Sequence, residues 1–205
     1  MKIAVLGGAF DPPHIGHYLV ARQVKELLEM DEVWFMVCYS YFPEFPDKMK
    51  RITGYEDRYA MATLMNENGN MRVSDFEYRY NPRSRTVDTI RLLKKNFPGN
   101  TFHWVIGSDT LPTFRLWNEW KKLVSDENLV VFPRDTDIPT LKNRVKKALD
   151  LVSIPRNVTV MEGNLIVSNI ASTHIRERIQ KNLPVSGLIR PEVESYIYAH
   201  KLYVK

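Results

Sequence analysis

Two histidines, His14 and His17, follow a short apolar stretch and a pair of glycines near the start of the chain. Glycines at Gly7-Gly8 leave the backbone open, so its N–H groups can approach phosphate oxygens. Because the histidines are three residues apart at the start of a predicted helix, we expect them to share one face of that helix. Imidazoles beside a helix N-terminus are suited to binding anions, and phosphate chemistry is the first hypothesis.

The run Gly7–His17 also permits other interpretations. It lacks the G-x-G-x-x-G spacing of dinucleotide-binding loops and the Gly-Lys-Ser/Thr of a Walker loop. A glycine-rich turn with capping histidines is the plain structural alternative. Zinc would need a third or fourth ligand, and none is evident nearby, so we predict no metal ion held by the protein itself.

Two further segments carry groups that can bind a nucleotide. Ser172 and Thr173 suit a helix N-cap, and Arg176, one turn later, can reach the same anion. Taken alone, a Ser-Thr pair before a helix is more often only a cap. Gly107 and Asp109 follow a buried apolar stretch, where a carboxylate can accept hydrogen bonds from ribose hydroxyls; the alternative is an ordinary turn residue.

The elements that must position these groups alternate along the chain. Strands are predicted at Ile3–Leu6, Glu32–Val37, Met71–Phe76, Phe102–Ile106, Leu129–Phe132 and Val158–Met161. Helices are predicted at Ile15–Leu28, Asp57–Met65, Val87–Lys95, Leu141–Leu149 and Ile175–Gln180, with a last one opening at Arg190-Pro191-Glu192. This alternation predicts an α/β fold with a doubly wound parallel sheet in a single domain, residues 1–205. Ligands of such sheets bind at the carboxyl ends of the strands, where the three segments would meet.

Composition narrows the classes of partner. The 205 residues carry a net charge of +5, from 29 Lys and Arg against 24 Asp and Glu, which permits nucleic acid, a membrane surface or a phosphorylated metabolite. The single cysteine, Cys38, fits a reducing compartment, and we expect a cytoplasmic protein. No apolar run approaches the length of a membrane span.

No RNA-binding signature, finger or long basic arm is present, so a basic nucleic-acid-binding α/β module is only a distant alternative. Oligomeric state, a homo-oligomer included, is left open.

The sequence resembles a known family at these same segments. The run GGAFDPPHIGH is similar to the (H/T)xGH signature of the nucleotidyltransferase superfamily. In its longer form, GGxFxPxHxGH, it resembles the nicotinate/nicotinamide mononucleotide adenylyltransferases. Ile170–Arg176 resembles their ISSTxIR motif, with Ala171 in place of the first Ser, and Trp104–Asp109 resembles their IGxD segment. The resemblance extends from Met1 to about Tyr203.

The resemblance implies a Rossmann-like fold and adenylyl transfer from ATP to nicotinate or nicotinamide mononucleotide. The products would be the adenine dinucleotide and pyrophosphate, in NAD biosynthesis, formed by in-line displacement with no covalent intermediate. Mg²⁺ would be held by phosphates and water. The resemblance assigns catalysis to His14, His17 and Arg176. It assigns ATP binding to Gly8, Ala9, Phe10, Gly107, Asp109, Ser172, Thr173 and Arg176. The C-terminal helical part, about residues 170–205, would complete the ATP site.

The resemblance also implies a set of residues that bind the mononucleotide: Lys48, Arg85, Thr86, Trp117, Trp120 and Arg134. Three positions depart from the family pattern. Phe45-Pro46-Asp47-Lys48 stands where many bacterial members carry Pro-Pro-His-Lys, Arg85 replaces the Tyr of SYT, and Asn118 follows Trp117 in place of an aromatic residue. These changes leave the choice between nicotinate and nicotinamide open. The alternative is a related nucleotidyltransferase with another phosphorylated acceptor, of the phosphopantetheine or cytidylyl type.

Overall fold

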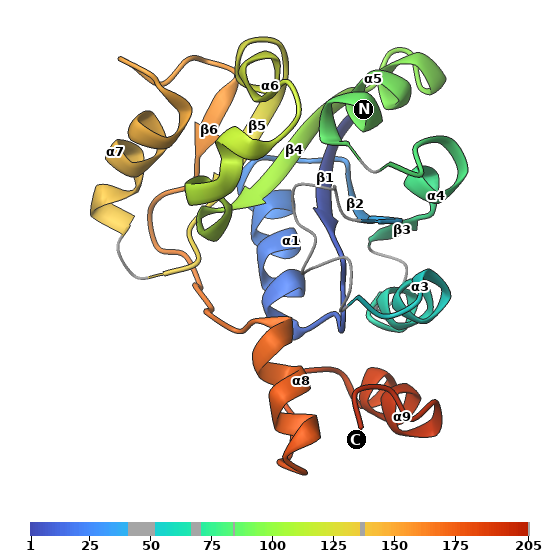
Figure 1. The fold of residues 1–205 in the computed structure, drawn as a ribbon. Helices are drawn as coiled ribbons and strands as arrows, with labels where there is room; N and C mark the ends of the chain where they lie inside the picture. The colour runs from blue at the N-terminus through green and yellow to red at the C-terminus, as the bar shows by residue number, and fades with distance from the viewer. Residues whose placement is uncertain (41–51, 67–70, 84, 136–137, 205) are drawn as a thin grey trace.

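The computed structural model describes residues 1–40, 52–66, 71–83, 85–135 and 138–204. Its centre is a sheet of six parallel strands in the order β3-β2-β1-β4-β5-β6 (Figure 1). The strands are β1 (Lys2–Gly8), β2 (Glu32–Val37), β3 (Arg72–Ser74), β4 (Thr101–Gly107), β5 (Asn128–Phe132) and β6 (Val158–Val160). The order reverses between β1 and β4, and ligands of doubly wound sheets bind at such a reversal.

Helices cover both faces of the sheet. They are α1 (Ile15–Leu27), α3 (Tyr55–Leu64), α4 (Phe76–Tyr80), α5 (Thr86–Asn96), the 3₁₀ helix η2 (Ser108–Leu116), α6 (Trp120–Asp126), α7 (Ile138–Leu149), α8 (Ser172–Gln180) and α9 (Pro191–Ala199). Figure 1 shows α8 and α9 beyond the carboxyl ends of the strands, on the side of the sheet opposite the N-terminus.

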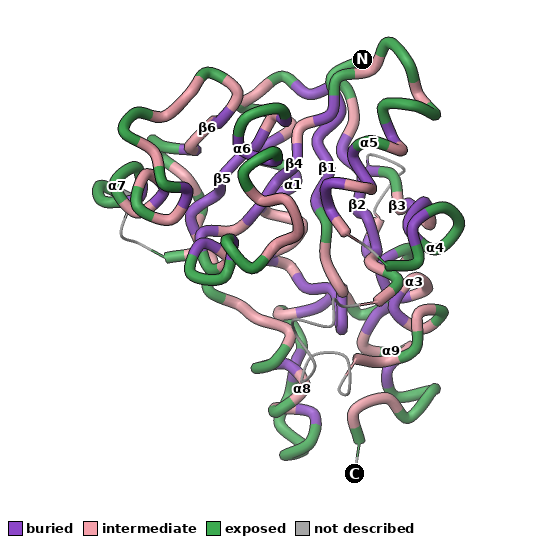
Figure 2. Tube along the Cα trace, turned by 45° about the horizontal axis from the view of Figure 1, so that its top comes forward, coloured by how far each residue is buried: buried purple, intermediate pink, exposed green. Residues whose placement is uncertain are grey.

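Alternating strand residues build two separate cores. In β1, Ile3 and Val5 pack in the core that includes α5, α6 and α7, whereas Ala4 and Leu6 pack in the core with α1 and α3. The two sets separate because successive side chains of a β-strand point to opposite faces of the sheet. Figure 2 shows the buried central strands flanked by half-buried and exposed helices. Because both faces are covered, the strands are nearly continuous apolar runs.

A third apolar cluster attaches the C-terminal helices. Ile175 of α8 and Ile197 of α9 are fully buried with Met61 of α3. The first turn of α8 is therefore fixed close to the carboxyl ends of the strands.

The predicted α/β fold and its parallel sheet are confirmed, with corrections at particular elements. The strand expected at Met71–Phe76 covers only Arg72–Ser74, because Phe76 already belongs to α4. The helix expected from Ile175 begins at Ser172. Helices α4, η2 and α6 were not predicted. Much of the irregular stretch Tyr39–Tyr55 lies outside the described residues.

Candidate active site

A cavity of about 540 Å³ lies at the carboxyl ends of the central strands. Its lining includes most of the predicted site residues: Gly8, Ala9, Phe10, His14, His17, Thr86, Gly107, Asp109, Trp117, Arg134, Ser172, Thr173 and Arg176. Lys48 lies outside the described residues. Arg85 and Trp120 do not line the cavity within the described part of the chain. The volume is in the range of sites that bury a small ligand.

The two histidine rings stack directly on each other. Their centroids are 3.7 Å apart, at an interplanar angle of 28°. His14 is the N-cap of α1 in extended conformation, and His17 is the third helical residue. Both rings line the cavity, so the expectation that they share one face directed at the site is confirmed. The rings meet because the backbone N–H of His14 donates to Nδ1 of His17 at 3.1 Å. A neutral His17 that accepts at Nδ1 carries its hydrogen on Nε2, and that atom is its donor.

Both imidazoles are held neutral. Burial lowers the pKa of His14 to about 3, and the positive charge of Arg134 adds to the effect. Burial likewise keeps the pKa of His17 well below its ordinary value, with smaller contributions from His14 and Arg134. At neutral pH the pair offers uncharged hydrogen-bond donors, and the positive charge of this end comes from arginines.

Close packing explains the small residues around the histidines. A methyl group at Gly16 would lie 3.0 Å from Nδ1 of His14 and 3.3 Å from Nη1 of Arg134, tighter than ordinary contact. Gly7 was predicted to open the backbone toward a ligand, but a methyl group there would lie 2.6 Å from the Trp104 ring. Phe10 has a left-handed φ of 53° and packs its buried ring 4.9 Å from that of His17.

Arg134 joins the end of β5 to neighbouring segments. Its backbone N–H donates to Ser108 Oγ at 2.9 Å, and its Nη2 donates to the carbonyl of Ile170. Arg134, which the resemblance assigns to the mononucleotide, lies beside Asp109, 3.9 Å from Nε to Oδ1, and near both histidines. Gly107 makes this crowding possible, since a methyl group there would lie 2.2 Å from Asp109 Oδ1.

The start of α8 is tied to the loop between β1 and α1. Ser172 Oγ donates to the carbonyl of Pro12 at 2.8 Å, and Arg176 Nη1 donates to the carbonyl of Asp11 at 2.6 Å. The predicted Ser-Thr cap is corrected, because Ala171 is the N-cap and Ser172 is the first helical residue. The backbone N–H groups of Ser172 and Thr173 still lie in the first turn of α8, where the helix dipole favours an anion.

Aromatic and hydroxyl groups also line the cavity. Thr86 is buried at the first position of α5. Trp117 is half-buried and stacks on Phe114, with centroids 5.1 Å apart. Trp120 lies instead in the core packing around α6, where the Arg115 guanidinium sits 5.5 Å from its ring centroid. Of the two tryptophans predicted to face the pyridine ring, only Trp117 reaches the cavity.

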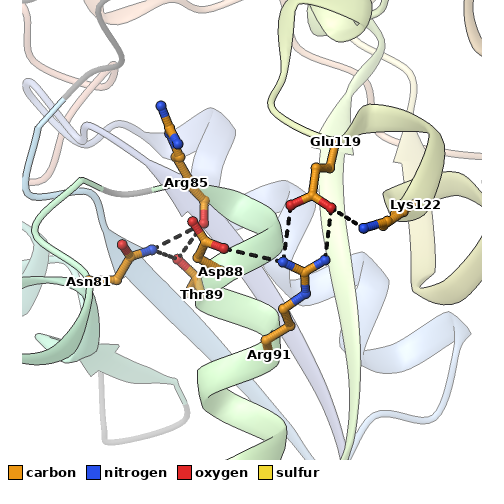
Figure 3. A network of polar contacts seen from close by, with 7 residues as sticks. All are labelled: Asn81, Arg85, Asp88, Thr89, Arg91, Glu119 and Lys122. Atoms are coloured by element: carbon orange, nitrogen blue, oxygen red, sulfur yellow. Dashed lines mark hydrogen bonds and ion pairs between the residues drawn. The ribbon is translucent and has the colours of Figure 1, made fainter.

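A polar network connects the elements that carry Thr86 and Trp117 (Figure 3). Arg91 of α5 donates two hydrogen bonds to Glu119, at 3.1 and 3.0 Å, directly before α6. Arg91 and Lys122 together lower the pKa of Glu119 to about 2. Asn81 Nδ2 donates to the carbonyl of Arg85 at 3.1 Å and fixes the start of α5. The bonds between Arg91 and Glu119 thus hold together the segments that carry Thr86 and Trp117.

Sequence reasoning gave no role to Arg58, which organises the cavity rim. Its side chain is 1% exposed and donates to four backbone carbonyls, those of Ala9, Cys38, Tyr39 and Thr53. A charged residue in an amphipathic helix is expected on the solvent side, so the apolar pattern gives no reason to expect Arg58 beneath the cavity rim.

Two further cavity-lining residues, Glu77 and Cys38, were also missed. Glu77 is buried and accepts a hydrogen bond from the Thr89 hydroxyl at 2.7 Å. Burial raises the pKa of Cys38 to about 12, so the residue is a thiol and a poor nucleophile at neutral pH.

The cavity combines neutral imidazole donors, arginines and a helix start, groups that bind polyphosphate and stabilise developing charge. The family model described as cytidylyltransferase-like matches residues 5–178 of this chain. The protein is therefore a nucleotidyltransferase.

Curated relatives match along nearly the whole chain. A protein of Exiguobacterium sibiricum is 31% identical over 204 residues, covering 99% of each chain. One from Shouchella clausii is 34% identical over 209 residues, covering 98% of this chain and 96% of the relative. Both carry the name "Probable nicotinate-nucleotide adenylyltransferase". Within the nucleotidyltransferases, the chain belongs to the nicotinate-nucleotide adenylyltransferase family.

Solved structures agree on the fold. Plasmodium falciparum nicotinic acid mononucleotide adenylyltransferase complexed with NaAD superposes with a TM-score of 0.76 at 21% identity, covering 98% of this chain and 97% of the other. The same enzyme complexed with APC gives a TM-score of 0.73. The predicted Rossmann-like fold is confirmed. Within the described part of the chain, no helix has both the length and the apolar composition that crossing a membrane requires.

Proposed function

We propose that this protein transfers the adenylyl group of ATP to nicotinate mononucleotide, yielding nicotinate adenine dinucleotide and pyrophosphate. The observation that carries the proposal is that one cavity brings two sets of groups together. His14, His17, Arg134 and Arg176 suit a polyphosphate, and Trp117 with the start of α5 offers an aromatic ring and a hydroxyl to the acceptor. The names of the curated relatives favour the nicotinate over the nicotinamide acceptor.

The reaction is a single in-line displacement. An oxygen of the acceptor 5′-phosphate attacks the α-phosphorus of ATP and forms the new P–O bond. The bond from the α-phosphorus to the oxygen bridging it to the β-phosphorus breaks, and pyrophosphate carries that electron pair away. No protein group takes the adenylyl moiety, which fits a Cys38 whose pKa is raised to about 12. The protein contributes positioning and stabilisation of developing charge.

Within this scheme the histidines act as hydrogen-bond donors. Nε2 of His17 carries its hydrogen in the neutral ring and would donate to a non-bridging phosphate oxygen. Such a donor strengthens its hydrogen bond as charge develops and needs no proton transfer. Arg176 and the first turn of α8 would hold the β- and γ-phosphates that leave. Gly107 and Asp109 would contact the adenosine ribose.

We propose MgATP as the nucleotide substrate. Among the described residues, no three His, Cys, Asp or Glu side chains are grouped closely enough to hold a metal ion. We therefore expect Mg²⁺ to enter with ATP, bound by phosphate and water oxygens as this hard cation prefers.

The remaining predictions form part of the same proposal. Residues from about 170 to 205 complete the ATP site, which is supported by the bonds from Ser172 and Arg176 to the loop between β1 and α1. Pyridine nucleotides, rather than nucleic acid or a membrane, are the partners. A cytoplasmic setting fits a substrate pair of small anionic metabolites.

A pyrophosphate-release assay tests the proposal directly. Purified protein is given MgATP with nicotinate mononucleotide, nicotinamide mononucleotide or phosphopantetheine, and in parallel MgCTP replaces MgATP. We expect the highest kcat/KM with MgATP and nicotinate mononucleotide. Turnover with phosphopantetheine or CTP, but with neither pyridine mononucleotide, would contradict the substrate assignment and leave the family intact.

A further inference from the structure

The loop between β1 and α1 contains a buried carboxylate that the scheme above does not use. Asp11 is 4% exposed and faces Tyr203 near the C-terminal end of the chain. Its Oδ1 accepts a hydrogen bond from the Tyr203 hydroxyl at 2.6 Å, across 192 positions of sequence. Its Oδ2 accepts a bond from the backbone N–H of Thr53 at 3.3 Å. Both carboxylate oxygens therefore have neutral donors.

Arg176 lies next to this carboxylate without pairing closely to it. Its Nη1 is 3.9 Å from Asp11 Oδ2, a loose ion pair, and instead donates to the backbone carbonyl of Asp11 at 2.6 Å. Nη2 donates to Thr173 Oγ1 at 3.2 Å, at the rim of the cavity. The guanidinium is thus positioned by neutral acceptors, so most of its charge is available to a bound anion.

Tyr203 is well placed to maintain this arrangement. It follows α9 and packs beside the apolar cluster of the C-terminal helices, with its hydroxyl oxygen 4.0 Å from Met61 Sδ. Burial and the nearby Asp11 carboxylate raise its pKa, so the hydroxyl keeps its proton and serves as a donor. A residue at the end of the chain is thereby connected to the first phosphate-binding loop.

We propose that Tyr203 is a positioning residue whose hydroxyl holds the Asp11 carboxylate away from Arg176, so that Arg176 can bind the polyphosphate of ATP. The proposal rests on the proposed function, since it gives Arg176 an ATP-binding role. Without the hydroxyl, Oδ1 of Asp11 would be a buried acceptor lacking its donor, which is costly. Among the described residues, Arg176 is the cation that pairs with this carboxylate, 3.9 Å from Oδ2. A carboxylate released from Tyr203 can turn toward that guanidinium, and a close ion pair there would consume the charge that ATP needs.

Replacement of one hydroxyl tests this. Tyr203→Phe removes the donor, and the matched control Tyr196→Phe removes a hydroxyl from α9 that donates to Asp57 Oδ1 at 3.0 Å. We expect Tyr203→Phe to weaken MgATP binding about tenfold, measured by calorimetry without acceptor, because a contact to a charged group is worth that much. The KM for nicotinate mononucleotide should not change. Tyr196→Phe should leave both the MgATP affinity and the KM for nicotinate mononucleotide at the wild-type values. These expectations hold even where either variant lowers Tm.

A second measurement needs no variant. Coupling between two sites is reciprocal, so ATP must strengthen the Tyr203 contact if that contact strengthens ATP binding. We expect MgATP to slow amide hydrogen exchange in residues 200–204 of the wild-type protein. Equal MgATP affinity in Tyr203→Phe and Tyr196→Phe, or exchange indifferent to MgATP, would overturn the positioning role alone. A wild-type protein that does not bind MgATP would overturn the proposed function and, with it, this inference.

Discussion

The stacked histidine pair shows how a hydrogen bond to one ring nitrogen determines the role of the other. The His14 backbone occupies Nδ1 of His17, and burial keeps both rings uncharged. An uncharged donor can bind a phosphate oxygen without holding the leaving pyrophosphate as a full ion pair would. In the proposed function the site separates two tasks, with imidazoles donating to the reacting phosphate and arginines binding the phosphates that leave.

His17→Ala removes the Nε2 donor while sparing the loop that holds ATP. We expect kcat to fall about 10²–10³-fold with MgATP affinity within a few-fold of wild type, because the donor matters most where charge develops. Steady-state pyrophosphate release and calorimetry measure the two quantities. His200→Ala, at an exposed histidine after α9, is the control. Wild-type turnover in His17→Ala would disprove the catalytic assignment.

Much of the site was predictable at the level of single residues. His14, His17, Arg176 and Asp109 all reach one cavity because each follows the end of a strand or begins a helix at that edge. The placement of Arg134 was not predictable, since its side chain direction depends on the Ile170 carbonyl and on the missing side chain of Gly107. Such contacts join segments that are far apart in the sequence, so no local sequence pattern predicts them.

At the scale of elements, one ion network joins α5 to the turn before α6, the two segments that contribute Thr86 and Trp117 to the cavity wall. Arg91 connects the helix that carries Thr86 to Glu119, two residues after Trp117 (Figure 3). Glu119 itself has a left-handed φ of 49°, where a side chain is uncommon. The network therefore supports both the backbone turn and the spacing between these two elements.

Arg91→Ala should loosen this wall. We expect the KM for the mononucleotide to rise about two- to fivefold while the KM for MgATP is unchanged, since exposed ion pairs contribute modestly. Initial rates with each substrate varied in turn give both constants. Arg22→Ala, which breaks an exposed pair with Glu26 within α1, is the matched control. A rise in the KM for MgATP instead would place this network on the ATP side.

The elements differ in how well sequence predicts them. The strands β1, β2, β4 and β5 are apolar, β-branched runs, and their expected positions agree with the structure to within one or two residues. Helices α4 and α6 span five and seven residues, too short for an apolar period to repeat. The 3₁₀ helix η2 contains Pro112, and its spacing differs from the α-helical period. Short elements take their shape from tertiary packing.

At the scale of the whole molecule, the neutral histidines make folding sensitive to acid. In the unfolded chain each histidine takes up a proton near pH 6.5, whereas in the folded protein His14 does so only near pH 3. Between these values the unfolded state binds more protons, so the free energy of unfolding falls as pH falls. The slope from one such residue approaches about 1.4 kcal/mol per pH unit.

Urea unfolding from pH 7 to pH 4 measures this dependence. His14→Asn should lose less stability over the interval than wild type, because one of the histidines whose pKa is lowered by folding is absent. His200→Asn, at an exposed position, should retain the wild-type slope. Identical slopes for His14→Asn and wild type would show that His14 is not held neutral by the fold.

The two outer strands of the sheet, β3 and β6, have only three residues each. An unpaired strand edge is a template on which another chain can add a strand, and long flat edges lead to aggregation. Here each edge offers so few unpaired N–H and C=O groups that edge-to-edge growth gains little. If copies of this chain associate, we therefore expect their interface to be formed by helices, with the sheet remaining within each copy.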